Sequence, residues 1–115
     1  MATVFNNIDK VAGDPQISAL VTIELVWDKR VSPVAKIEDE DTMVQGYYGT
    51  GTDDDGRWSV SLTANDEITP ADSVYKILER ISQGDVTTEY YISVPQGATA
   101  VYWSGDLIVE APEWA

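Results

Sequence analysis

The chain has 115 residues, a length that fits one domain, and it contains neither cysteine nor histidine. This composition excludes disulfides, thiolate nucleophiles, zinc sites built from those residues, and imidazole bases. Twenty acidic residues against seven basic ones give a formal charge of -13. This balance argues against nucleic acid and anionic membranes as partners, because both attract lysine and arginine. No apolar run approaches the ~20 residues that a membrane-spanning helix needs.

The N-terminal residues 1–19 lack a regular hydrophobic period. Asn6-Asn7 and Gly13-Asp14-Pro15 interrupt any strand or helix pattern. The larger apolar side chains of this segment, which include Phe5 and Ile8, are too scattered to define a buried face. We therefore predict an extended N-terminal arm over residues 1–19.

The C-terminal residues 111–115 are predicted to form a short tail, because Pro112 halts any strand there. Trp114 follows, and a large apolar group of this kind gains roughly 1.5–3 kcal/mol or more when it is buried. Neither the arm nor the tail is expected to bury much against its own domain. We therefore expect Phe5 and Trp114 to dock on adjacent subunits.

The first clear strand begins at Leu20. Its apolar residues alternate with more polar ones and form one face, made of Val21, Ile23, Leu25 and Trp27. Residues 28–33 have the composition of a turn, and residues 34–37 predict a short edge strand. The four consecutive acids at 38–41 repel one another and predict a solvated loop, after which residues 43–48 predict another strand.

Residues 46–62 carry the most informative pattern of the chain. An apolar run ends in a polar, glycine-rich turn, and strict alternation follows, with Trp58, Val60 and Leu62 on one face. This pattern predicts a β-hairpin with a polar turn.

The turn Asp53-Asp54-Asp55-Gly56 allows two interpretations. An EF-hand calcium loop aligned on it places Gly51 and Leu62 at the first and last ligand positions, where carboxylates are needed. A looser metal site with Glu38, Asp39 or Asp41 stays open as an alternative. An ordinary turn is favoured, because Asp and Gly supply local hydrogen bonds and positive φ without metal. We predict no metal and no cofactor.

Residues 74–81 are also ambiguous. Thr69 could cap a helix whose first residue is Pro70, and the apolar spacing of 74–81 suits a helix. The same residues alternate as a strand would, and residues 87–94 are rich in β-branched and aromatic side chains. We favour a hairpin of two strands here. Short strands are also predicted over 99–103 and 107–109.

About seven short strands, with turn signals at roughly 8–12-residue spacing, predict an all-β sandwich or small barrel. The series Thr52-Asp53-x-Asp55-Gly56-x-Trp58, followed by alternation, resembles the strand–turn–strand of transthyretin-like and carboxypeptidase-regulatory-like sandwiches. This resemblance implies a single antiparallel β-sandwich of transthyretin-like or immunoglobulin-like type over residues 20–110. That family is functionally mixed, so the resemblance supplies mainly a fold.

A narrower resemblance covers the Trp58 strand, a Leu-x-x-Asn loop ending at Asn65, Pro70 before the Tyr75 strand, and a strand ending in Val94-Pro95. In this order and spacing, the series resembles small β-sandwich modules of bacteriophage virion proteins. It implies a structural protein of the virion, assembled in the host cytoplasm. Both a capsid decoration or minor head protein and a tail-associated module stay open.

The acids lie mostly in turns, where they are hydrated, and no set of nucleophile, base and orienting group is identifiable, so we predict no catalytic residue. Two tyrosine pairs lie in predicted strands, and one member of each pair must point outward. Exposed aromatic groups can anchor a protein contact or stack on sugars. The predicted interaction residues are Phe5, Ile8, Tyr47, Tyr91, Trp103 and Trp114.

The expected partners are capsid or tail subunits, with self-association as a further candidate. The main rival function is a carbohydrate-binding sandwich of a tail fibre that recognises a glycan on the host surface. A second rival is an acidic regulatory or adhesin-type sandwich in a cellular protein.

Overall fold

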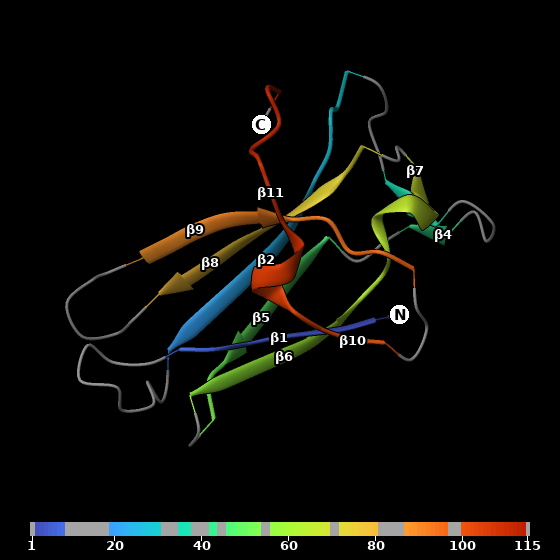
Figure 1. The fold of residues 1–115 in the computed structure, drawn as a ribbon. Helices are drawn as coiled ribbons and strands as arrows, with labels where there is room; N and C mark the ends of the chain where they lie inside the picture. Colours follow the sequence, from blue (N-terminus) through green and yellow to red (C-terminus); the bar gives the residue numbers. More distant parts are fainter. Residues whose placement is uncertain are drawn as a thin grey trace.

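The computed structural model describes residues 2–8, 19–30, 35–37, 42–43, 46–53, 56–69, 72–80, 87–96 and 100–114. In this part of the chain the fold is all-β, with two 3-10 turns and no α-helix. A five-stranded and a three-stranded sheet pack face to face, and a small third sheet lies at one end of the molecule (Figure 1). The expected sandwich-like all-β architecture is therefore confirmed.

The five-stranded sheet has the order β11-β9-β8-β2-β5, and its neighbouring strands are all antiparallel. Its strands are β2 (Leu20–Val26), β5 (Tyr47–Gly51), β8 (Val74–Arg80), β9 (Thr87–Ile92) and β11 (Ile108–Val109). In the three-stranded sheet, the central strand β1 pairs antiparallel with β6 and parallel with β10. These strands are β1 (Ala2–Asn7), β6 (Arg57–Leu62) and β10 (Val101–Trp103).

The small sheet has the order β4-β3-β7. It is built from β3 (Lys36–Ile37), β4 (Thr42–Met43) and β7 (Ile68–Thr69), and the 3-10 turns are η1 (Asn65–Glu67) and η2 (Ser104–Leu107). The described part of the chain thus has eleven strands rather than about seven. Four of them, β3, β4, β7 and β11, have two residues each. β3 and β11 lie within the short strands predicted at 34–37 and 107–109.

The predicted N-terminal arm is wrong for residues 2–7, because they form the central strand β1. β1 runs in register with β6 from Ala2 opposite Leu62 to Asn7 opposite Arg57. Ala2 and Val4 are buried in the core. The third inward residue of the strand is the polar Asn6. The inner face is therefore not uniformly apolar, and the sequence lacks the apolar–polar alternation that would predict a strand. The arm is also wrong for Ile8, which packs against the core, and for Ala19, which is buried. Residues 1 and 9–18 lie outside the described residues.

The predicted hairpin over residues 46–62 is also wrong. β5 pairs with β2 in one sheet and β6 pairs with β1 in the other, so the chain crosses between sheets at the Asp-rich turn. The Asp53 amide donates to the Arg57 carbonyl at 3.0 Å, and Gly56 adopts a positive φ of 74°. Alternation of apolar and polar residues is the same in a hairpin and in a crossing strand, so the pattern could not decide which one forms.

Two further strand predictions need correction. Residues 43–48 do not form one strand, because β4 ends at Met43, β5 begins at Tyr47, and Gly46 lies in neither. The short strand expected at 34–37 is β3, which is central in the small sheet rather than at its edge. The predicted solvated loop at 38–41 lies outside the described residues.

The ambiguous segment 74–81 contains strand β8, which pairs antiparallel with β9 from Tyr75 opposite Ile92 to Arg80 opposite Thr87. The strand interpretation is therefore confirmed, and the helix interpretation is wrong. The strand at Leu20 is confirmed as β2, with its apolar face buried.

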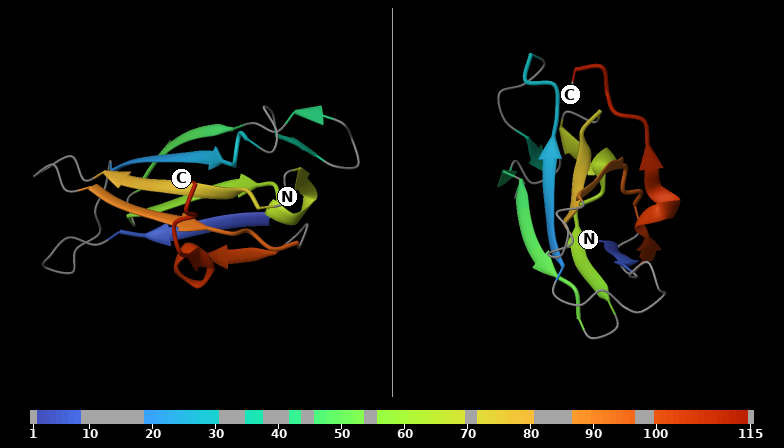
Figure 2. Two further views of the ribbon diagram at one scale, coloured as in Figure 1. Left: turned by 90° about the horizontal axis from the view of Figure 1, so that it is seen from above. Right: turned by 90° about the vertical axis from the view of Figure 1, so that its left-hand side faces the viewer.

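The core lies between the two main sheets (Figure 2). Its largest fully buried side chains include Trp58 and Leu62 from β6, Ile23 from β2, and Tyr75 and Ile77 from β8. Full burial of each Leu, Ile or Val side chain contributes roughly 1.5–3 kcal/mol. Trp58 and Leu62 thus point into the core, as the alternation predicts.

Candidate functional site

Three residues of the virion-module resemblance, Asn65, Tyr75 and Val94, are buried inside the sandwich. The Asn65 amide group donates to Ser73 Oγ at 3.2 Å, and Asn65 Oδ1 accepts from the Val94 amide at 2.7 Å. The Tyr75 hydroxyl donates to the Thr63 carbonyl at 2.8 Å. All of these bonds are buried, and buried polar groups need such partners. These three residues therefore stabilise the fold.

A second chain of hydrogen bonds joins the two sheets through the carboxylate of Glu79, which is only 6% exposed. Trp58 Nε1 and Asn6 Nδ2 both donate to Glu79 Oε2, at 2.6 and 2.7 Å. Asn6 Oδ1 in turn accepts from Trp103 Nε1 at 2.9 Å. This chain orients the indole of Trp103, which stays 48% exposed.

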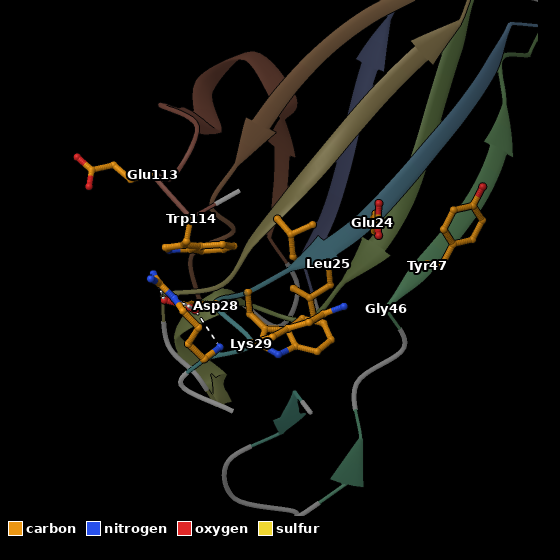
Figure 3. Close-up of a pocket in the computed structure, with 11 residues that line it drawn as sticks. Glu24, Leu25, Asp28, Lys29, Gly46, Tyr47, Glu113 and Trp114 are labelled. Atoms are coloured by element: carbon orange, nitrogen blue, oxygen red, sulfur yellow. Dashed lines mark hydrogen bonds and ion pairs between the residues drawn. The ribbon is translucent and has the colours of Figure 1, made fainter. Parts of the chain in front are cut away.

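An open pocket of about 900 Å³ lies at the end of β2, next to the C-terminal segment (Figure 3). Its volume is within the ~300–1,000 Å³ typical of small-molecule sites. We call it the aromatic pocket, and its lining includes Trp27, Asp28, Lys29, Arg30, Tyr47 and Trp114. Figure 3 shows the Trp114 ring above Asp28 on one side and Tyr47 on the opposite side.

The charged groups of the aromatic pocket are held in place by local contacts. Asp28 Oδ1 accepts from the backbone amide and Nε of Arg30, at 2.9 and 3.0 Å, and Oδ2 accepts from Nη2 at 2.9 Å. These bonds from Arg30 lower the pKa of Asp28, so the carboxylate is ionised at neutral pH. Lys29 Nζ lies 5.6 Å from the centroid of the Trp27 ring.

A second candidate surface is the outer face of the five-stranded sheet. The strand registers align one outward residue from each strand in a continuous row, and we call this row the tyrosine face. Its members are Tyr47, Glu24, Lys76, Tyr91 and Val109. Tyr47 is 60% exposed and Tyr91 is half-buried. The row therefore offers two aromatic groups separated by one acid and one base.

The predicted interaction residues fall into separate regions. Tyr47 lies both on the tyrosine face and in the aromatic pocket, Tyr91 lies on the tyrosine face, and Trp114 lies in the aromatic pocket. Trp114 is half-buried against its own domain, which corrects the expectation that the tail stands clear of it. One member of the Tyr47-Tyr48 pair is exposed and the other packs against the core, as predicted.

Phe5, Ile8 and Trp103 lie away from these surfaces. Phe5 is half-buried in β1, next to Trp103 in register, and the Arg57 guanidinium carbon lies 4.0 Å from its ring centroid. Ile8 directly follows β1, is half-buried and packs against the core. Strand β1 thus ties both Phe5 and Ile8 to the sandwich.

Sequence reasoning did not predict that residues 27–30 line a pocket. Trp27 was expected in the core, and it does pack there, but it also lines the aromatic pocket. One sequence feature could have indicated this pocket: three charged residues, Asp28-Lys29-Arg30, directly follow Trp27 at the end of the predicted strand. Sequence reasoning also did not predict that Glu79 is buried between the two sheets. The sequence pattern of a strand does not distinguish a buried acid from an exposed one.

Among the described residues there is no group of three or more acids that could hold a metal ion. The described part of the chain also contains no helix long and apolar enough to cross a membrane. No protein-family model matches the chain, and neither does any curated protein.

Proposed function

We propose that this protein is a non-enzymatic structural module of a bacteriophage virion that acts through protein–protein contacts. It would serve as a capsid decoration or minor head protein, or as a tail-associated module. The virion assignment is supported by the ordered motif series that resembles such modules. Buried bonds join members of that series, Asn65, Tyr75 and Val94, to the interior, as expected for residues that define a module.

The observation that carries the contact role is the tyrosine face. Tyrosine is enriched in protein interfaces, where its ring is buried while its hydroxyl keeps a hydrogen bond. Tyr47 is 60% exposed. The outward charges of this sheet face, Glu24, Lys76, Arg80 and Glu89, cancel, and Lys76 Nζ pairs with Glu89 Oε1 at 3.0 Å. The face can therefore be covered by a partner without leaving a net charge buried.

The edge strand β5 continues this surface. Within the described residues β5 pairs only with β2, and its sequence Tyr47–Gly51 has no charge and no proline to block a further strand. Gly49 is exposed, and a side chain there would meet nothing within 4 Å. The partner we propose is a capsid or tail subunit that lays an extended segment along β5 and over Tyr47.

Three of the described carboxylates are already bound by hydrogen-bond donors. Glu79 is buried beneath two donors, Asp28 is paired with Arg30, and Asp53 Oδ1 accepts the Arg57 amide at 3.0 Å in a turn. A catalytic pair needs accessible carboxyl groups that face a common substrate.

Mass spectrometry and immunogold labelling of purified phage particles test this proposal. The wild-type chain is expected in the particles, and labelling distinguishes head from tail. A Tyr47→Ala/Tyr91→Ala chain should melt nearly normally, since surface substitutions usually change stability by about 0.5 kcal/mol or less, yet enter particles poorly. Val101→Ala, which changes an exposed apolar group of the other sheet, is the matched control and should be incorporated normally.

The virion role would be contradicted if purified particles lacked the wild-type chain. Normal incorporation of the double tyrosine variant would leave the virion role standing and exclude the tyrosine face as the contact.

A further inference from the structure

Two indoles from distant parts of the sequence converge on the aromatic pocket. Trp27 directly follows β2, Trp114 lies near the C-terminus, and both are half-buried. In Figure 3 the flat face of Trp114 borders the open space above Asp28 and Lys29. Flat aromatic faces of this kind suit a ligand that presents a flat, weakly polar C–H surface.

The pocket also offers fixed hydrogen-bonding groups. The Asp28 side chain is 12% exposed and the Arg30 side chain is 81% exposed, so the guanidinium lies on the solvent side of the pair. Arg30 has more side-chain N–H donors than the two that Asp28 engages, and the carboxylate, which already accepts three bonds, has about one lone-pair site left. Such a planar donor–acceptor pair suits neighbouring hydroxyl groups, which both donate and accept.

The charges that line the pocket nearly cancel. The acids are Glu24, Asp28 and Glu113, and the bases are Lys29 and Arg30. An anionic ligand would meet three carboxylates on a chain of charge -13. A cationic ligand would compete with Lys29, whose ammonium already lies 5.6 Å from the Trp27 ring centroid. Because the pocket disfavours both anionic and cationic ligands, we expect an uncharged one.

We infer that the aromatic pocket binds a neutral oligosaccharide. Trp114 stacks on the apolar face of a sugar ring, Trp27 lines the pocket beside it, and the Asp28–Arg30 pair binds neighbouring hydroxyl groups. A pocket of about 900 Å³ is large for a single ring, which favours a short oligosaccharide. This activity goes beyond the proposed virion role, which requires only protein contacts.

The test uses the full chain and a panel of neutral oligosaccharides derived from starch, cellulose, chitin and mannan, together with neutral bacterial surface glycans on an array. The strongest hit is then titrated by calorimetry. Trp114→Ala should weaken binding about tenfold or more, because one stacking wall is lost. Trp103→Ala removes another half-exposed indole, on the other sheet, and should leave the affinity unchanged. Arg30→Ala should also weaken binding, through loss of hydrogen bonds.

Circular dichroism melting of each variant shows that it folds. The inference is overturned if no glycan of the panel binds, if Trp114→Ala and Trp103→Ala bind equally well, or if only a quaternary ammonium such as tetramethylammonium binds. Trp114→Ala is expected to enter phage particles normally. Loss of sugar binding with normal incorporation therefore separates this site from the proposed structural role, and each can fail without the other.

Discussion

Replacing Trp58 with alanine is expected to remove much of the stability of the sandwich. Trp58 is 1% exposed and points from β6 into the core between the two sheets. Its Nε1 also donates to the buried Glu79 carboxylate at 2.6 Å. The substitution therefore leaves a large cavity and removes one donor from the buried Glu79 side chain, while Asn6 still binds the same oxygen.

The size of the effect follows from both losses. Truncation of a buried Trp to Ala typically costs about 3–5 kcal/mol, and most small domains have only about 5–15 kcal/mol in total. A hydrogen bond to a charged group contributes about 1.5–3 kcal/mol. Trp58→Phe keeps much of the ring but loses the donor. We therefore expect it to cost about 1.5–3 kcal/mol, less than Trp58→Ala.

Urea unfolding followed by circular dichroism measures both variants against the wild type. Ser59→Ala is the matched control, because Ser59 is the exposed neighbour on the same strand, and it should change stability by about 0.5 kcal/mol or less. An unchanged unfolding midpoint for Trp58→Ala would show that Trp58 is not a core residue. Equal destabilisation by Phe and Ala would show that ring packing adds nothing to the hydrogen bond.

Four further predictions concern other parts of the molecule. Burial raises the pKa of Tyr75 and of Tyr90 above the ordinary 10.0. The folded state then keeps protons that the unfolded chain loses, so stability in urea should fall as the pH rises above about 10, and a flat profile would contradict this. Deletion of residues 2–8 removes the central strand β1 and should abolish cooperative melting, whereas a normal melting curve would restore the arm interpretation. Gly105→Ala would place a methyl carbon 2.6 Å from the Trp103 ring, so one indole N–H signal should shift in the NMR spectrum, and an unchanged spectrum would argue against this packing. Melting in excess EDTA should match melting in calcium, because local hydrogen bonds close the Asp-rich turn, and a rise of several degrees in calcium would favour the metal-site alternative.

Local periodicity revealed the strands whose two faces differ clearly. β2 is the best case, because Val21, Ile23 and Leu25 are all buried while Leu20 and Glu24 are exposed. Such alternation is a direct consequence of the two-residue repeat of a strand. The same logic identified the β8–β9 hairpin, once the β-branched and aromatic content of residues 87–94 was taken into account.

The missed features depend on tertiary structure. β1 has the polar Asn6 on its inner side, and this residue is satisfied by Glu79 from the other sheet, so no local pattern could reveal it. The partners of β5 and β6 are likewise set by distant strands. The aromatic pocket joins Trp27 to Trp114, a pairing that only the folded chain creates.

Hydroxyl-radical footprinting of the protein, free and in assembled phage particles, tests the central claim most directly. The structure exposes Tyr47 and part of Tyr91 in the free protein, so both should be labelled there. In the particle, both should be protected, while Trp103 on the other sheet should be labelled equally in the two states. Equal labelling of both tyrosines in the two states, or absence of the chain from the particle, would contradict the proposal that the tyrosine face binds a neighbouring virion subunit.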